Sequence, residues 1–119
     1  MPMIEFRYNP EKISKFKAEG ICPDLEGALR SALRELRPDH DDYGVFVEGD
    51  PFDVHHNQAD LSVYVFYHPS WQFEEWELAL LPEKMGHFLR PALRNFAITA
   101  SVRIRCYRRD GYAGTSFSV

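Results

Sequence analysis

The chain has 119 residues, of which 45% are hydrophobic and 27% are charged, and its formal net charge is −4. This length suits one domain with its own core, so we expect a single domain over residues 1–119. The negative charge argues against a protein that neutralises many nucleic-acid phosphates, because that mode of binding needs a surplus of lysine and arginine. The chain has neither a membrane-spanning apolar stretch nor the opening pattern of a secretory signal, so we expect a cytoplasmic protein.

The first half of the chain has the pattern of strand, helix and strand. Residues 3–8 alternate between apolar and polar, which predicts a strand, and residues 9–23 predict a loop with at most a short helical turn. A helix should begin at the N-cap Asp24 and end before Pro38, because leucine and alanine recur on one helix face between them. A short strand at residues 43–48 follows, and a Gly-Asp-Pro turn should close it.

The second half repeats the pattern. Residues 59–68 are apolar on both faces, which predicts an interior strand near the middle of the sheet. Residues 72–96 follow the helical period, but Pro82 and Pro91 would each cost roughly 3 kcal/mol inside a straight helix, so we expect a kinked or split helix. Residues 101–108 alternate between an apolar and a basic face and predict a last strand. The remaining tail carries many apolar groups and should pack or pair with another segment.

This element order predicts an α+β two-layer sandwich, in which both helices cover one face of a mixed four-stranded sheet. The other face of the sheet would still carry tyrosine, phenylalanine, valine and methionine side chains. That is more apolar area than a monomer usually exposes. We therefore expect the protein to associate with copies of itself.

A proline at position 2 directly precedes the first predicted strand. Removal of the start methionine before so small a residue would leave Pro2 with a free secondary amine, fixed at the tip of a strand. A free α-amine titrates near about 8, and burial or neighbouring positive charge lowers its pKa, so such an amine can act as a base near neutral pH. Alternatively, Pro2 merely starts a strand where no backbone donor is needed. Taken alone, the proline fits this second interpretation better.

Three segments together carry a resemblance to a known family. They are Met1-Pro2 leading into the first strand, Leu36-Arg37-Pro38-Asp39 after the first helix, and Val102 to Tyr107 with the Gly114-Thr115-Ser116-Phe117 tail. In these segments, and in its element order over nearly the whole length, the chain resembles the tautomerase superfamily, which includes macrophage migration inhibitory factor.

The resemblance implies a tautomerase-like β-α-β repeat that assembles as a homotrimer, with active sites at the subunit boundaries. It implies that Pro2 is the catalytic base of a keto-enol tautomerase or isomerase that needs no cofactor. Arg37 falls at the family's basic position after the first helix, and Arg103, Arg105 and Tyr107 fall on the strand that lines the family's pocket. These four residues would hold a small carboxylate-bearing keto or enol substrate, because a guanidinium offers a fork of donors that matches a carboxylate.

Other interpretations of the polar residues remain open. A non-catalytic trimer of the same fold could bind a partner or an anionic ligand through its arginines, and Arg103 and Arg105 could also form an ordinary solvated strand face. Arginines interleaved with tyrosines also occur in RNA-binding strands, but the acidic balance of the chain argues against nucleic acid. We expect no metal site and two cysteines that serve as small buried hydrophobes. The residues that invite a metal interpretation, but fit a polar loop better, are Asp53, His55, His56 and Asp60.

Overall fold

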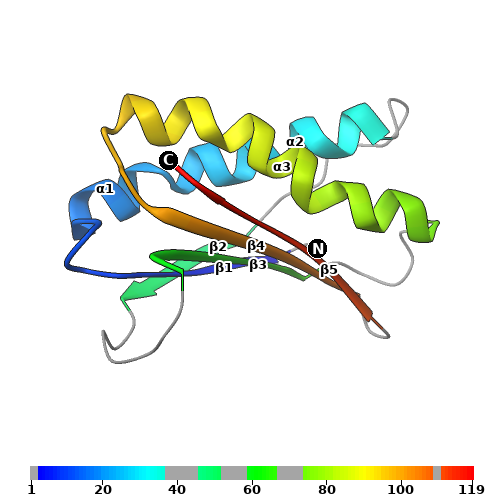
Figure 1. Ribbon diagram of the computed structural model, residues 1–119, viewed down its shortest axis with the longest axis horizontal. Helices are drawn as coiled ribbons and strands as arrows, with labels where there is room; N and C mark the ends of the chain where they lie inside the picture. Colours follow the sequence, from blue (N-terminus) through cyan, green and yellow to red (C-terminus); the bar gives the residue numbers. More distant parts are fainter. Residues whose placement is uncertain (1–2, 37–45, 52–58, 67–73, 109–110) are drawn as a thin grey trace.

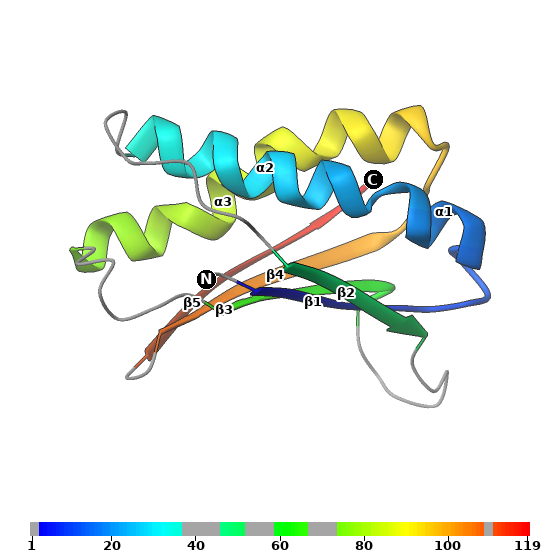
Figure 2. The ribbon, with the colours of Figure 1, turned by 180° about the vertical axis from the view of Figure 1, so that it is seen from behind.

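The structure, a computed structural model, describes residues 3–36, 46–51, 59–66, 74–108 and 111–119. Within these residues five strands form one sheet in the order β2-β1-β3-β4-β5, and the two long helices lie side by side over one of its faces (Figures 1 and 2). The elements are β1 (Met3–Tyr8), α1 (Lys15–Gly20), α2 (Cys22–Leu36), β2 (Phe46–Pro51), β3 (Leu61–Phe66), α3 (Glu75–Asn95), β4 (Ser101–Arg108) and β5 (Gly111–Ser118).

The sheet is mixed because it joins two β-α-β units. β1 pairs with β2 in parallel, β3 pairs with β4 in parallel, and β1 and β3 run antiparallel to each other where the two units meet. This arrangement confirms the predicted two-layer sandwich, and β3 has the interior position that its apolar faces predicted. The C-terminal tail, which was expected to pack or pair, forms a fifth strand antiparallel to β4.

Alternation in the strands decides which face the helices cover. Ile4, Phe6 and Tyr8 of β1 are buried, and the intervening Arg7 is exposed. The helices supply leucines at helical spacing to the same core, so apolar side chains from both layers meet between them. The fully buried core side chains of the helices include Leu25, Leu29, Leu81, Met85, Leu89 and Leu93. In the described chain, no helix is long and apolar enough to cross a membrane.

The second strand extends further along the chain than predicted. β2 spans Phe46–Pro51, whereas the sequence predicted residues 43–48 followed by a turn. Gly49 was interpreted as a turn residue, but it lies within the strand. The Phe6 ring fills the space that a side chain at this position would need, so packing explains the glycine. Pro51 ends the strand, and β2 is at the edge of the sheet, where a missing backbone donor is tolerated.

Two helix predictions also need correction. α2 begins at Cys22, so Asp24 lies in its first turn and is not the N-cap, and Pro23 occupies an early position where no hydrogen-bonded N–H is required. α3 is one continuous helix of 21 residues that contains both Pro82 and Pro91, so of the predicted kink or split, the split does not occur. Burial of its apolar face against the sheet outweighs the local cost of the prolines.

α3 ends in a Schellman motif. The N–H of Ile98 donates to the carbonyl of Leu93 at 2.9 Å, and the N–H of Ala97 donates to the carbonyl of Arg94 at 2.9 Å. Ala97 has φ = 52°, which is the left-handed conformation that glycine usually supplies at this position. The backbone of Ala97 is therefore strained, and the motif turns the chain into β4.

Candidate functional site

The uncovered face of the sheet carries the predicted substrate-binding residues of β4. Strand register arranges the side chains of this face in three rows across β1, β3 and β4. The rows are Met3–Phe66–Tyr107, Glu5–Tyr64–Arg105 and Arg7–Ser62–Arg103. The face therefore changes from aromatic at the start of β1 to basic at its end.

The aromatic end of this face is held together by ring stacking. The Tyr107 ring lies 5.4 Å from the Phe66 ring with an interplanar angle of 16°, and 6.2 Å from the Tyr64 ring with an angle of 28°. Phe66 is 37% exposed, so the platform remains accessible to a ligand or to another subunit. Stacked pairs of this kind contribute about 0.5–1.5 kcal/mol beyond the area they bury.

The structure brings only some of the predicted site residues together. Arg103, Arg105 and Tyr107 share one face and are half-buried, but they are spread along β4. Tyr107 is level with Met3 at the start of β1, whereas Arg103 lies four residues away, about 13 Å along the strand. Pro2 and Arg37, the predicted base and a predicted substrate-binding residue, lie outside the described residues.

Arg103 borders a hollow at the basic end of the sheet. The hollow has a volume of about 450 Å³ and lies against the ends of β4 and β5, where Ser101, Ser116 and Ser118 also line it. The neighbouring hydroxyl of Ser62 is buried and has no hydrogen-bond partner among the described residues. An arginine surrounded by hydroxyl groups is suited to an anion, because both kinds of group can donate hydrogen bonds.

Asp60 takes part in a local hydrogen-bond cluster. Its carboxylate accepts hydrogen bonds from the amide of Asn9 at 3.2 Å and from the backbone N–H of Ser101 at 3.2 Å. This carboxylate therefore joins the loop after β1 to the start of β4. Three other residues of the metal interpretation, Asp53, His55 and His56, lie outside the described residues.

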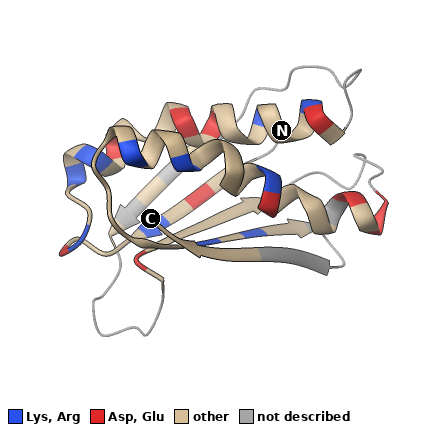
Figure 3. Ribbon diagram, turned by 45° about the horizontal axis from the view of Figure 1, so that its top comes forward, with Lys and Arg blue, Asp and Glu red and all other residues tan. Residues whose placement is uncertain are grey.

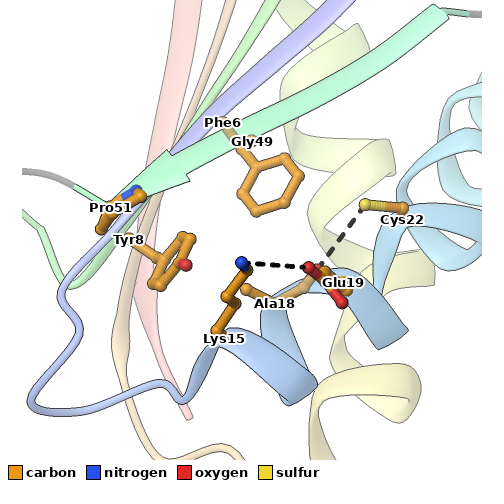
Figure 4. Close-up of a pocket in the computed structure, with 8 residues that line it drawn as sticks. All are labelled: Phe6, Tyr8, Lys15, Ala18, Glu19, Cys22, Gly49 and Pro51. Carbon is orange, nitrogen blue, oxygen red and sulfur yellow. Dashed lines mark hydrogen bonds and ion pairs between the residues drawn. The ribbon is translucent and has the colours of Figure 1, made fainter.

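A second, more enclosed cavity lies on the helix side of the sheet. It has a volume of about 340 Å³ and lies between α1, the end of β1 and β2. Figure 4 shows the Phe6 and Tyr8 rings extending from β1 beside the cavity, with Gly49 and Pro51 of β2 above them. Its volume falls in the range of pockets that bind small molecules, about 300–1,000 Å³. No pattern in the sequence indicates this cavity.

Among the described residues that line this cavity, the charged groups lie on one side of it. Lys15 and Glu19, one turn apart on α1, face each other with 4.0 Å between Nζ and Oε1, and their side chains are 82% and 70% exposed. The Cys22 thiol lies 3.6 Å from the carbonyl oxygen of Ala18, and burial, with a smaller effect of Glu19, raises its pKa. The thiol is therefore protonated at neutral pH. Lys15 and Glu19 carry opposite charges, so together they do not create a field of one sign beside the cavity. Acidic and basic residues are interspersed along the helices in the same way (Figure 3).

Comparison with known proteins identifies the fold. No protein-family model and no curated protein matches the sequence. Among solved structures, the chain is similar to Leishmania major MIF2, with a TM-score of 0.55 and 13% sequence identity, over 98% of this chain and 97% of that one. A match that covers both chains almost completely shows the MIF-like tautomerase fold, and the low identity limits the conclusion to the fold.

Proposed function

We propose, from the fold that the chain shares with Leishmania major MIF2, that it is a tautomerase-like isomerase acting on a small keto or enol carboxylate. The observation that carries the proposal is the register of Met3 with Phe66 and of Phe66 with Tyr107. Pro2 precedes Met3 in the chain, so a base at this position would act beside the stacked rings of Phe66 and Tyr107. An aromatic platform of this kind suits a substrate with a flat, conjugated body.

The proposed reaction moves one proton. After removal of Met1, the amine of Pro2 takes a proton from the carbon next to the carbonyl, and the electrons of that C–H bond move toward the carbonyl oxygen to form an enolate. Return of the proton to the oxygen gives the enol, and the reverse sequence gives the keto form. Arg105, which is two residues from Tyr107 on the same face, would hold the substrate carboxylate or the growing negative charge.

We also propose that the protein is a homotrimer whose uncovered sheet faces are hidden in the assembly. Met3, Tyr64, Phe66 and Tyr107 form an apolar region on that face. A second subunit would bring further side chains to the start of β1, and this would allow Arg37 and the arginines of β4 to serve one site from different copies.

The test compares proteins that differ only in the state of Pro2. Intact-mass spectrometry first shows whether Met1 has been removed. Conversion of an arylpyruvate enol to its keto form is then followed by ultraviolet absorption. Pro2→Ala should lower the rate by about a hundredfold to ten-thousandfold, the usual contribution of a positioned base. As a control, an N-terminal tag left in place turns the nitrogen of Pro2 into an amide and should have a similar effect. Equal rates in the parent and both altered proteins would show that Pro2 is not the base.

One observation favours a second candidate, a non-catalytic protein that binds an anion. The hollow beside Arg103 is lined by hydroxyl groups and lies away from the start of β1. This candidate predicts that inorganic phosphate binds and that Arg103→Ala abolishes binding, whatever the state of Pro2.

A further inference from the structure

The cavity between α1, β1 and β2 lies apart from the site proposed at Pro2. Phe6 and Tyr8 border it, and they are respectively three and five residues after Met3 on β1. At about 3.3 Å per residue, the cavity is about 10–17 Å along the strand from the position where Pro2 would act. It also lies on the helix-covered side of the sheet, whereas the two rows that hold Arg105 and Tyr107 are on the other side.

The walls of the cavity are aromatic and apolar. The Phe6 and Tyr8 rings have centroids 6.2 Å apart with an interplanar angle of 34°, and Ala18 approaches them from α1. Phe6 is fixed in place because its ring packs directly against the backbone of Gly49. Two positioned rings offer a flat ligand stacking or edge contacts, and such contacts add to the gain from burying apolar surface.

The charges beside the cavity favour neither sign of ligand charge. Lys15 and Glu19 carry opposite charges, and both are largely exposed. A ligand with a net charge of either sign would be attracted by one of these side chains and repelled by the other, so neither an anion nor a cation is selected. We propose that this cavity is a second binding site for a small aromatic molecule, which it recognises by the ring and not by the sign of its charge.

The probe for this proposal is indole, which is uncharged and aromatic and is small relative to the cavity. Binding to the full-length protein is measured by calorimetry and by the rate at which the Cys22 thiol reacts with a disulfide reagent. Cys106 is fully buried in the core, so Cys22 is the thiol that reports in the folded protein. Indole should bind with a dissociation constant on the order of a millimolar or tighter and should slow the reaction of Cys22 in a saturable way.

A matched pair of variants on α1 tests the location. Ala18→Leu adds a larger side chain at the cavity wall and should weaken indole binding by at least about tenfold. Phe16→Ala removes an aromatic residue from the same helix that is 79% exposed and does not line the cavity, and its indole binding should equal that of the parent. Circular dichroism and thermal unfolding confirm that each variant is folded. If Ala18→Leu does not fold, Cys22→Leu, which narrows the cavity from the start of α2, replaces it.

Two charged ligands test the chemical class. Indole-3-acetate and tryptamine have the same ring system with a negative and a positive group, and each should bind within a few-fold of indole. Saturable indole binding that is lost in Ala18→Leu and kept in Phe16→Ala supports the site. The proposal is overturned if indole does not bind, if Ala18→Leu binds it as the parent does, or if either charged ligand is preferred by about tenfold or more.

Discussion

The Phe6 ring occupies the space that a side chain at position 49 would need, so an added Cβ on Gly49 would overlap the ring atoms of Phe6. The two residues lie on adjacent strands in register, and both face the helix layer. Phe6 is buried, so a shift of its ring away from position 49 changes its packing in the core. Gly49 is therefore required by packing rather than by a turn.

This relationship predicts that Gly49→Ala lowers the free energy of unfolding by about 1–3 kcal/mol, as overpacked cores do. Gly27→Ala is the matched control, since nothing lies within 4 Å of a Cβ added there and Gly27 is exposed within α2. The control should raise the free energy of unfolding by up to about 1 kcal/mol, because alanine is favoured over glycine inside a helix. Urea unfolding measures both, and similar changes in the two variants would contradict the packing argument.

At Ala97 the change from alanine to glycine, the reverse of the two substitutions above, should stabilise the protein. Ala97→Gly should stabilise the protein by up to about 1 kcal/mol, because glycine adopts the left-handed conformation at the end of α3 without strain. The hydrogen bond that the Lys17 ammonium donates to the carbonyl oxygen of Ala97, at 3.3 Å, uses the backbone and should persist. Asn95→Gly, in the last turn of the same helix, should destabilise it. Thermal unfolding that ranks the two variants in the reverse order would be inconsistent with strain at Ala97.

The proposed trimer depends on the uncovered sheet face. Phe66→Glu places a charge within the aromatic platform and should convert the trimer to monomers, because an unpaired charge at a desolvated interface is costly. Trp76→Glu changes an exposed aromatic residue on the helix layer and should leave the assembly unchanged. Sedimentation velocity at micromolar concentration measures both. A monomeric parent protein would remove the case for a site shared between subunits.

The arginines of β4 distinguish the two proposed functions. Arg105→Ala should weaken binding of an arylpyruvate carboxylate by about tenfold to a hundredfold, the contribution of a charge-assisted hydrogen bond. Arg103→Ala should weaken it less, because Arg103 lies a row further from Tyr107. Arg94→Ala removes an exposed arginine from the last turn of α3 and serves as the control. Calorimetry that shows a larger loss for Arg103 than for Arg105 would favour the anion-binding alternative.

The two thiols should react at very different rates. Cys106 is fully buried, and its desolvation strongly raises its pKa, so it should react with a disulfide reagent only after unfolding. Burial and, to a smaller extent, Glu19 raise the pKa of Cys22, so its thiolate fraction at pH 8 is below that of a free cysteine. Because the thiolate is the reacting form, the rate at which Cys22 reacts should increase as the pH rises. Glu19→Gln removes the negative charge, lowers this pKa and should speed the reaction at pH 8 by about two- to threefold. Two equally reactive thiols in the folded protein would contradict the burial of Cys106.

The predictability of the fold followed the strength of the local pattern. β1, β3 and β4 were predicted within a few residues, because burial on one or both faces gives a clear period or a continuous apolar run. The end of β2 was predicted too early because Gly49 and Pro51 are turn residues in most contexts. Their presence in the strand is explained by the position of the Phe6 ring and by the sheet edge. Likewise, Pro82 and Pro91 predicted a break that tertiary packing of α3 overrides.

The candidate site was less predictable than the fold. Alternation along residues 101–108 correctly placed Arg103, Arg105 and Tyr107 on one face of β4. The pattern could not indicate that Tyr107 stacks on Phe66, because that contact depends on strand register. The cavity beside α1 depends on the register of Phe6 with Gly49 in the same way, and it also needs a short helix that the sequence predicted only as a turn within a loop.

The strand order β2-β1-β3-β4-β5 has a consequence for synthesis of the protein. β1 is made before both of its partner strands, β2 and β3. Tyr8 pairs with Leu61, so the two halves of the sheet can join only after Leu61 has been made. One hydrogen-bonding edge of β1 therefore stays without its native partner until residues 61–66 have been made. By contrast, β4 and β5 are neighbours both in sequence and in the sheet, so they can pair as soon as they are complete. Long-range pairing slows folding, and the opening strand is consequently the segment most at risk of mispairing in the nascent chain.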